Sequence, residues 1–330
     1  MAGIRIGVLG AARIAPQAIV KPAAGSPDAS VVAVAARDRA KAEAFAKKHE
    51  IPHVHESYAA LLADPEVDAI YNPLPNGLHG EWTIKALEAG KHVLCEKPFT
   101  SNADEAREVK VVADAHPDLV VMEAFHYRYH PFAERLREIV TGGELGTVQR
   151  VETAMCFPLI HRNDIRWDYG LAGGATMDVG CYTIHCLRLL AGEEPEVVSA
   201  EAKLKGPKVD RAMVAEMAFP GGATGKIHCS MWSSSVLKLG ARVVGDKGEL
   251  TVRNFTMPHL FGKLTVSTDA GSRSEVGSKD RTYVRQLDAF CRTVGGDASA
   301  NLTPPSDSVA TMEVIDAVYQ AAGLPLRGVG

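Results

Sequence analysis

The sequence predicts an α/β protein of two domains: an N-terminal parallel sheet with helices, then an α+β domain with a large, mostly antiparallel sheet. Up to about residue 125, short apolar runs alternate with helical stretches, which is the pattern of βαβ units. Beyond that point, longer β-type segments are separated by Gly- and Pro-rich joints, which favour short antiparallel connections. We therefore expect domains at 1–125 and 126–330, with the last helix able to pack back on the first domain.

In the first domain, strands and helices alternate along the chain. The strands are expected at 4–9, 31–35, 68–71, 92–95 and 119–124. A first helix carries Pro16 in its first turn, and further helices are expected at 39–49, 58–63, 78–89 and 103–115. Asp38 and Ser57 are the expected N-caps of two of them, and Gly90 ends a third. Such units build a parallel sheet with right-handed crossovers.

The second domain opens with a helix at 131–140. The strands are expected at 148–157, 196–205, 213–219, 224–231, 239–244, 249–252 and 264–267. A helix at 177–190 is inserted among them, and helices at 281–294 and 306–322 close the chain.

Composition excludes several classes of protein. The formal net charge of -4 argues against a nucleic-acid or anionic-membrane partner, and no apolar run is long enough to span a bilayer. The six cysteines show neither a CxxC pair nor zinc-ligand spacing, so we expect no metal site. Buried, reduced thiols and an N-terminus without a signal-peptide pattern indicate a cytoplasmic protein.

A dinucleotide-type loop follows the first strand. Gly10 stands where the strand ends and a helix begins, so backbone N–H groups there can bind phosphate oxygens. Ala12 and Ala15 replace the second and third glycines of the usual Rossmann pattern, and both are small enough for close approach. The expected cofactor contacts of this loop are Gly10, Ala11, Ala12, Arg13 and Ile14.

The end of the second strand predicts which nicotinamide cofactor binds. An acidic residue there binds the ribose 2′-hydroxyl of NAD, whereas an arginine accommodates the 2′-phosphate of NADP. The chain has Ala36 at the acidic position and Arg37 next to it. We expect NADP to be preferred over NAD. Two alternatives stay open: Arg37 is a solvated residue, or Asp38 turns toward the ribose.

Two further motifs carry the predicted chemistry. Lys97, in the segment Cys95-Glu96-Lys97-Pro98, is a cation at the carboxyl edge of a buried strand, where open α/β sheets bind ligands. Behind the pair Gly173-Gly174, the residues Asp178, Tyr182 and His185 recur at helical spacing. They form either an active-site wall or a polar helix face in solvent.

The order and spacing of these motifs resemble the glucose–fructose oxidoreductase / inositol dehydrogenase (Gfo/Idh/MocA) family of sugar oxidoreductases. Tyr182, in place of the histidine that many members carry, resembles the branch with NADP-linked xylose dehydrogenase and dimeric dihydrodiol dehydrogenase. The resemblance implies that the cofactor also contacts Leu74, Asn76, His79, Glu96 and Lys97. By itself, His79 fits a surface position at a helix start better than a catalytic one.

The expected chemistry is an oxidoreduction of a CH–OH group on a sugar, a sugar-derived ketone or a cyclic diol. Tyr182 is the expected acid/base, Lys97 its activator and substrate orienter, and Asp178 a hydrogen-bond partner of substrate or lysine. Arg166 and Trp167, just before the glycine pair, are expected to border the substrate, unless Arg166 serves in a structural ion pair. The family implies a homodimer or homotetramer. Rival functions are a non-catalytic dinucleotide sensor and a lyase or glycosidase that recycles its nicotinamide.

Overall fold

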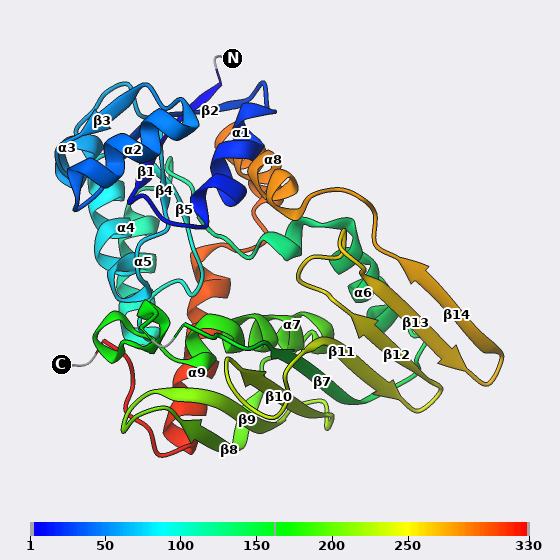
Figure 1. Cartoon of the computed structure of the whole chain (residues 1–330). Coiled ribbons are helices and arrows are strands. Elements are labelled where there is room, and N and C mark those ends of the chain that lie inside the picture. Colours follow the sequence, from blue (N-terminus) through cyan, green and yellow to red (C-terminus); the bar gives the residue numbers. More distant parts are fainter. Residues whose placement is uncertain (1–2, 162, 329–330) are drawn as a thin grey trace. The chain divides into compact units, whose positions relative to one another are not determined.

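The computed structural model describes residues 3–161 and 163–328, which divide into two compact units (Figure 1). The first unit runs to His126 and includes Tyr283–Val309, and the second comprises Tyr127–Thr282 and the chain from Ala310. This division differs from the predicted one at 283–309, which the structure groups with the first unit. The last helix, α9 (Pro305–Ala321), begins in the first unit and continues into the second.

The first unit contains a parallel six-stranded sheet in the order β3-β2-β1-β4-β5-β6, which confirms the predicted α/β class. Its strands are β1 (Ile4–Leu9), β2 (Ala29–Ala35), β3 (His53–His55), β4 (Ala69–Asn72), β5 (His92–Cys95) and β6 (Val121–Glu123). The short strand β3 was not predicted, because three residues are too few to show a hydrophobic alternation.

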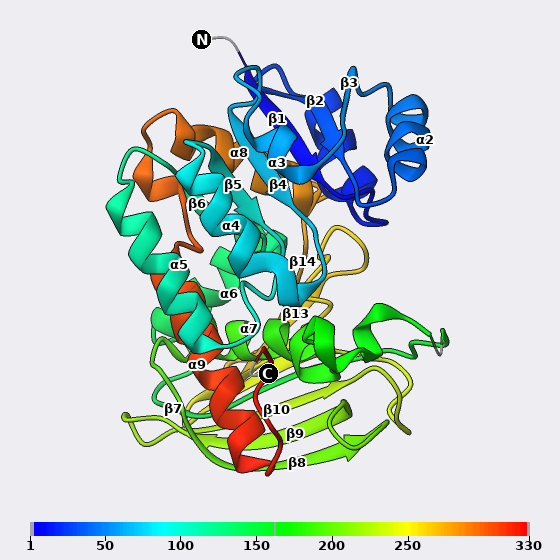
Figure 2. The same ribbon diagram turned by 90° about the vertical axis from the view of Figure 1, so that its left-hand side faces the viewer.

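The helical segments of the first unit are η1 (Pro16–Val20), α1 (Lys21–Ala24), α2 (Arg39–His49), α3 (Tyr58–Leu62), η2 (Asn76–Leu78), α4 (His79–Glu88), α5 (Ala103–Ala115), α8 (Thr282–Val294) and η7 (Ala298–Ala300). Two of them, α2 and α3, begin at the N-caps that the sequence predicts. Asp38 accepts from Lys41 N and Ser57 from Ala60 N, which confirms both predicted N-caps. Helices α4 and α5 pack side by side (Figure 2).

Residues 283–309 belong to the first unit because they cover the free edge of its sheet. Strand β6 lies at that edge, and its backbone groups need partners. Thr303 supplies two: its carbonyl accepts from Glu123 N at 3.1 Å, and its hydroxyl donates to Glu123 O at 2.7 Å. Asn301 donates to Val121 O at 2.9 Å. A segment far along the chain thus completes the parallel sheet.

The second unit contains an eight-stranded sheet in the order β14-β13-β12-β11-β7-β10-β9-β8. Its strands are β7 (Val148–Cys156), β8 (Glu196–Leu204), β9 (Asp210–Ala218), β10 (Thr224–Ser230), β11 (Lys238–Gly245), β12 (Gly248–Arg253), β13 (Lys263–Thr268) and β14 (Gly271–Val276). Neighbours are antiparallel except β7 and β10, so the predicted mostly antiparallel sheet is confirmed.

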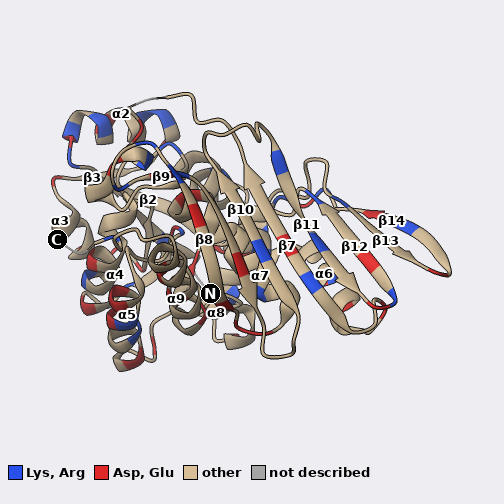
Figure 3. Cartoon of the chain, turned by 90° about the horizontal axis from the view of Figure 1, so that it is seen from below, with Lys and Arg blue, Asp and Glu red and all other residues tan. Residues whose placement is uncertain are grey.

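One face of this sheet packs on a helix, and the other carries charge. The helical elements of the unit are η3 (His126–Tyr129), α6 (Pro131–Thr141), η4 (Ile165–Trp167), η5 (Tyr169–Leu171), η6 (Thr176–Gly180) and α7 (Cys181–Ala191). Helix α7 packs on β7 and β10. In Figure 3 the ribbon colours mark positions of Lys, Arg, Asp and Glu along the strands. Ion pairs between neighbouring strands include Lys226–Glu216 at 2.5 Å and Arg242–Glu249 at 2.5 Å.

Candidate active site

The loop after β1 has the geometry of a dinucleotide-binding turn. Gly10 has φ of +86°, a conformation that side chains other than glycine rarely adopt. A Cβ at this position would also lie 3.3 Å from the Leu74 side chain. The helix then begins at Pro16, with Pro at its first position as predicted. Residues 11–14 form the turn between strand and helix. Arg13 is exposed, whereas Ala11, Ala12 and Ile14 are partly exposed.

At the end of β2, the structure distinguishes Arg37 from Asp38. Asp38 is engaged in the cap of α2 and lies 3.7 Å from the Lys41 ammonium group. Arg37 is exposed and makes no hydrogen bond or ion pair with the described part of the chain. A guanidinium group in this position can bind a phosphate with two parallel hydrogen bonds. The geometry therefore leaves the arginine, rather than the aspartate, available to a ligand.

His79 is buried and bridges two loops, instead of lying on the surface. It is 1% exposed at the start of α4, so the surface interpretation is wrong. Its Nδ1 lies 2.7 Å from Pro98 O, and its Nε2 lies 2.7 Å from Leu74 O. The ring therefore joins the loop after β4 to the loop after β5. Leu74 is 7% exposed, and Asn76 is partly exposed in the same loop.

Burial of His79 makes stability depend on pH. Burial lowers its pKa from 6.5 to about 4, outweighing the two carbonyl oxygens that favour a charged ring. The unfolded chain binds this proton below pH 6.5 and the folded chain only below about 4, so the contribution is lost as pH falls through that window. At pH 5 the loss is about 2 kcal/mol relative to pH 8.

The measurement is urea unfolding of the wild type and His79→Gln between pH 8 and 5. The variant removes the titrating group but keeps a donor for one carbonyl, so its free energy of unfolding should fall less steeply. Parallel pH slopes in the two proteins would contradict the assignment.

Glu96 and Lys97 follow β5 at the carboxyl edge of the parallel sheet. Glu96 is 8% exposed, and its Oε1 accepts from the Tyr71 hydroxyl at 2.7 Å. Tyr283 of α8 is also buried here in the first unit, and burial together with the Glu96 charge raises the pKa of its hydroxyl. Lys97 is partly exposed at the end of this buried polar group. Lys97 thus lies at this edge of the sheet beside a carboxylate that is fixed by the Tyr71 hydroxyl.

The second unit carries Asp178 and Tyr182 on a continuous helical segment with a change of pitch. Asp178 lies in the π-turn η6 and Tyr182 in α7, instead of on one regular helix as predicted. The π-turn adds one residue per turn locally, which rotates Asp178 relative to the residues that follow. Asp178 pairs with Arg166, whose Nε lies 3.1 Å from its Oδ2.

Tyr182 lies in a buried aromatic group. It is 6% exposed, and His185 is 3% exposed, so the alternative of a solvent-facing polar helix is wrong. The Tyr127 hydroxyl lies 2.5 Å from His185 Nδ1, and the rings of Tyr127 and Tyr182 are 6.1 Å apart between centroids. Sequence reasoning missed Tyr127. Its position just after a predicted buried strand, in the segment Phe125-His126-Tyr127, is the signal that could have indicated it.

Arg166 and Trp167 lie in the turn η4 before the glycine pair. Arg166 spans two carboxylates, since its Nη1 also lies 3.4 Å from Asp164 Oδ2. The structural ion pair that the sequence left as an alternative is therefore present, and one of its two carboxylates is the predicted site residue Asp178. Trp167 donates to His161 O at 3.1 Å, and the Lys205 ammonium group lies 4.2 Å from its ring centroid.

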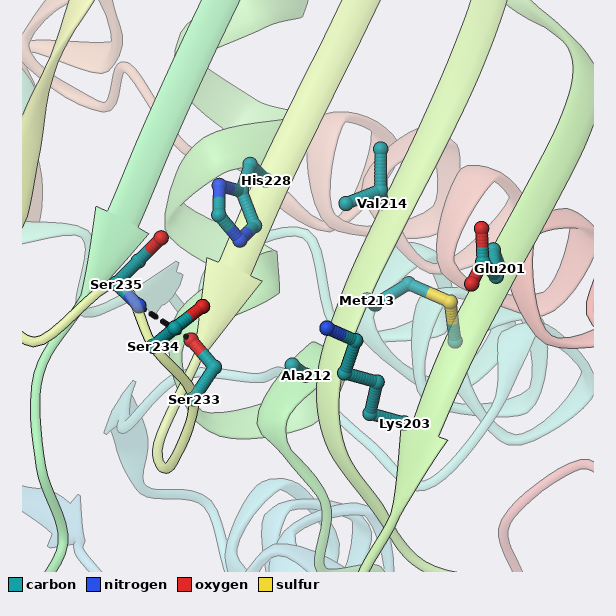
Figure 4. Close-up of a pocket in the computed structure, with 9 residues that line it drawn as sticks. All are labelled: Glu201, Lys203, Ala212, Met213, Val214, His228, Ser233, Ser234 and Ser235. Atoms are coloured by element: carbon teal, nitrogen blue, oxygen red, sulfur yellow. Dashed lines mark hydrogen bonds between the residues drawn. The ribbon is translucent and has the colours of Figure 1, made fainter.

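Other features of the chain lie apart from these residues. A hollow on the charged face of the sheet is lined by residues of β8, β9 and β10 and by Ser233, Ser234 and Ser235, and includes no predicted site residue (Figure 4). Within residues 3–161 and 163–328, no cluster of His, Cys, Asp or Glu is placed to hold a metal ion. Every helix over these ranges is too short or too polar to cross a lipid bilayer.

The predicted catalytic residues thus divide between the units. Lys97 lies in the first, with the glycine loop, and Asp178 and Tyr182 lie in the second, with Arg166. The glycine turn and the exposed arginine fit a dinucleotide, and a nicotinamide bound there would accept or donate hydride. A buried tyrosine and a carboxylate fixed by arginine suit proton transfer and substrate orientation.

Comparisons with known proteins agree with these features. A profile described as the oxidoreductase family with an NAD-binding Rossmann fold matches residues 4–124, and the GFO/IDH/MocA C-terminal domain matches residues 133–251. The NADP(+)-dependent D-xylose 1-dehydrogenase 2 of Haloferax volcanii is 37% identical over 96% of each chain. Trans-1,2-dihydrobenzene-1,2-diol dehydrogenase of Bos taurus is 38% identical over 66% of this chain and 64% of its own.

Among solved structures, a 3-ketoreductase from Actinomadura kijaniata in complex with NADP and TDP-benzene gives a TM-score of 0.87 at 28% identity, covering 97% of this chain and 98% of that one. Fold, glycine turn and relatives together define a nicotinamide-dependent oxidoreductase. The chain belongs to the Gfo/Idh/MocA family, which confirms the resemblance seen in the sequence.

Proposed function

We propose that this protein is an NADP-preferring dehydrogenase or reductase acting on a CH–OH group, or the matching ketone, of a monosaccharide or cyclic diol. The observation that carries the proposal is that a buried Tyr182 and an Arg166-bound Asp178 lie on one continuous helical segment. Supporting it, the names of the relatives describe a D-xylose dehydrogenase, a dihydrodiol dehydrogenase and a 3-ketoreductase.

We assign the proton transfer to Tyr182. A free tyrosine titrates near pH 10, so a neighbouring cation is needed for it to act near neutral pH, and Lys97 is the proposed source of that charge. In the oxidising direction Tyr182 takes the proton of the substrate hydroxyl, and in the reducing direction it returns a proton to the carbonyl oxygen. Asp178, held by Arg166, accepts a hydrogen bond from a substrate hydroxyl or from the lysine.

The functional test is a substrate screen. Purified protein is assayed at 340 nm with aldoses and cyclic diols in the presence of NADP or NAD, and with sugar ketones in the presence of NADPH or NADH. Turnover of at least one polyol or sugar ketone, faster with the phosphorylated cofactor, is expected. Tightly retained nicotinamide with substrate conversion but no net absorbance change would instead identify a cofactor-recycling lyase or glycosidase, and binding without any conversion a sensor.

Arg37→Ala should weaken NADP binding by about 1.5–3 kcal/mol, the scale of a charge-assisted hydrogen bond. NAD has no 2′-phosphate, so its binding should change little. Calorimetric titration of both cofactors measures the difference, with Arg39→Ala as the matched control because that arginine is also exposed and is paired with Glu43 at 2.8 Å. A wild-type preference for NAD, or equal losses for both cofactors, would refute the ribose assignment.

We also propose a cytoplasmic homodimer or homotetramer. All six cysteines are buried, and none forms a disulfide in the described part of the chain, which suits a reducing compartment. Burial raises the pKa of the Cys156 thiol to about 11 and of the Cys291 thiol to about 12, so both stay protonated and unreactive at neutral pH.

A further inference from the structure

A buried ion pair lies beneath the turn that carries Asp178. Arg327, near the C-terminal end of the described chain, pairs with Asp210 at the start of β9 through an Nη2–Oδ1 contact of 2.9 Å. Both side chains are fully buried. The guanidinium carbon lies 4.1 Å from the ring centroid of Tyr319 and 5.1 Å from that of Tyr169, so two aromatic rings enclose the cation. Burying two charges is costly unless further hydrogen bonds satisfy them.

Those further bonds go to one short stretch of backbone. Arg327 Nε donates to Gly173 O at 2.8 Å. Asp210 Oδ2 accepts from both the amide and the hydroxyl of Thr176, each at 2.7 Å. Its Oδ1 also accepts from the Tyr319 hydroxyl at 3.0 Å. The ion pair therefore binds the backbone on both sides of Gly174, at Gly173 and at Thr176, the first residue of the π-turn.

Residues 173–176, which the ion pair contacts, are hydrogen-bonded directly to the proposed active-site residues. Gly174 N donates to Arg166 O at 2.9 Å, and Asp178 N donates to Gly174 O at 3.0 Å. The same two residues then pair through their side chains, Arg166 Nε lying 3.1 Å from Asp178 Oδ2. A shift of the Gly174 backbone would therefore move both partners of that ion pair.

The backbone here needs such external support. Gly174 has φ of +140°, and a Cβ on it would lie 2.2 Å from Asp210 Oδ1, so glycine and the buried carboxylate are fitted to each other. The π-turn that follows is a rare helical form, and such turns are found frequently at functional sites.

We propose that Arg327 and Asp210 are positioning residues of the reaction: through Gly173 and Thr176 they fix the π-turn so that the Asp178 carboxylate is held beside Arg166. The inference rests on the proposed function in giving Asp178 a role in the reaction. It extends that function to the C-terminal segment, since Leu326 O also accepts from the Tyr169 hydroxyl at 2.6 Å. The segment is thereby a support of the substrate side of the site.

The test uses Arg327→Lys, Arg327→Met and Tyr319→Phe in the full chain, with Arg253→Met as the control because Arg253 is an exposed arginine of the same unit. Lysine keeps the charge but cannot reach both Asp210 and Gly173 with a planar fork. Tyr319→Phe removes one bond to Asp210 without removing a charge, so it keeps the proposal testable if Arg327→Met does not fold.

Two readouts are measured on each variant. Hydrogen exchange of the amides at 173–180 should become at least tenfold faster in Arg327→Lys and Arg327→Met and detectably faster in Tyr319→Phe. It should stay unchanged in the control, and exchange in β11–β13 should stay unchanged in the Arg327 and Tyr319 variants. Turnover on the best substrate should fall roughly 10–100-fold in the arginine variants, while the dissociation constant for NADP stays within about twofold, because an active site depends on geometry held to a fraction of an ångström.

A double variant separates positioning from mere stability. If Arg327 acts through Asp178, Arg327→Lys should cost little further turnover in an Asp178→Asn background, whereas an independent loss would multiply. Unchanged exchange at 173–180 in all three variants, or full multiplication of the two losses, overturns the proposal. Should Asp178→Asn alone keep wild-type turnover, the role of Asp178 fails, and the exchange readout still decides whether the ion pair fixes the turn.

Discussion

Tyr182→Phe is expected to lower turnover roughly 10²–10⁴-fold, the usual contribution of a positioned acid or base. The change removes the hydroxyl that is proposed to carry the proton and keeps the ring, which is 6% exposed and lies beside Tyr127. Folding should therefore survive, and so should cofactor binding, since the glycine turn and Arg37 lie in the other unit. Steady-state kinetics on the best substrate and calorimetric titration with NADP measure the two expectations separately.

Tyr127→Phe is the matched control for this experiment. It removes a hydroxyl from the adjacent buried ring, 2.5 Å from His185 Nδ1, and should cost much less turnover. A positioned acid or base contributes at least about 100-fold to turnover. If Tyr182→Phe lowers turnover by less than about tenfold, another group therefore transfers the proton. His185 and Lys97 are then the next groups to test.

Lys97→Ala is expected to cause a loss of similar size and to move the pH–rate profile of the remaining activity upward. A cation near a phenol favours the phenolate, so its removal raises the pKa of the tyrosine that is proposed to act as the base. Activity should then recover toward alkaline pH. The shift is measured as turnover at saturating NADP and substrate between about pH 6 and 10.

The double variant Lys97→Ala, Tyr182→Phe tests whether the two residues act as a unit. Its loss should be close to that of the more damaging single variant and far below the product of the two. Lys41→Ala, which removes an exposed lysine of α2, is the control for a general effect of lost charge. A Lys97→Ala profile that keeps the wild-type pH midpoint would show that the lysine only orients the substrate.

The parallel sheet, the helix caps and the glycine turn could be predicted because their signals are local. Apolar runs alternate with helices, Asp38 and Ser57 immediately precede the helices they cap, and Gly10 follows its strand directly. Several site features could not be predicted because distant groups determine them. His79 is buried by carbonyl oxygens of two separate loops, and no pattern around it in the sequence reports that.

Long-range contacts also explain the two largest differences from expectation. Helical spacing placed Asp178 and Tyr182 on one regular helix face, but the backbone at 173–176 is held by Asp210 and Arg327, and a π-turn follows. Likewise, the amphipathic pattern of α8 predicts a helix but not which sheet it accompanies. The segment that contains α8 accompanies the parallel sheet because Asn301 and Thr303, which follow α8, complete the edge of β6.

That edge has a consequence for how the protein is made. The ribosome adds β6 when little more than a third of the chain exists, and its partner segment at 301–303 comes near the end. Until then the nascent parallel sheet exposes a row of unpaired backbone groups, the kind of edge that recruits strands from other chains. The first unit therefore completes its sheet only after residues 301–303 have been made, although most of its residues precede them by far in the chain.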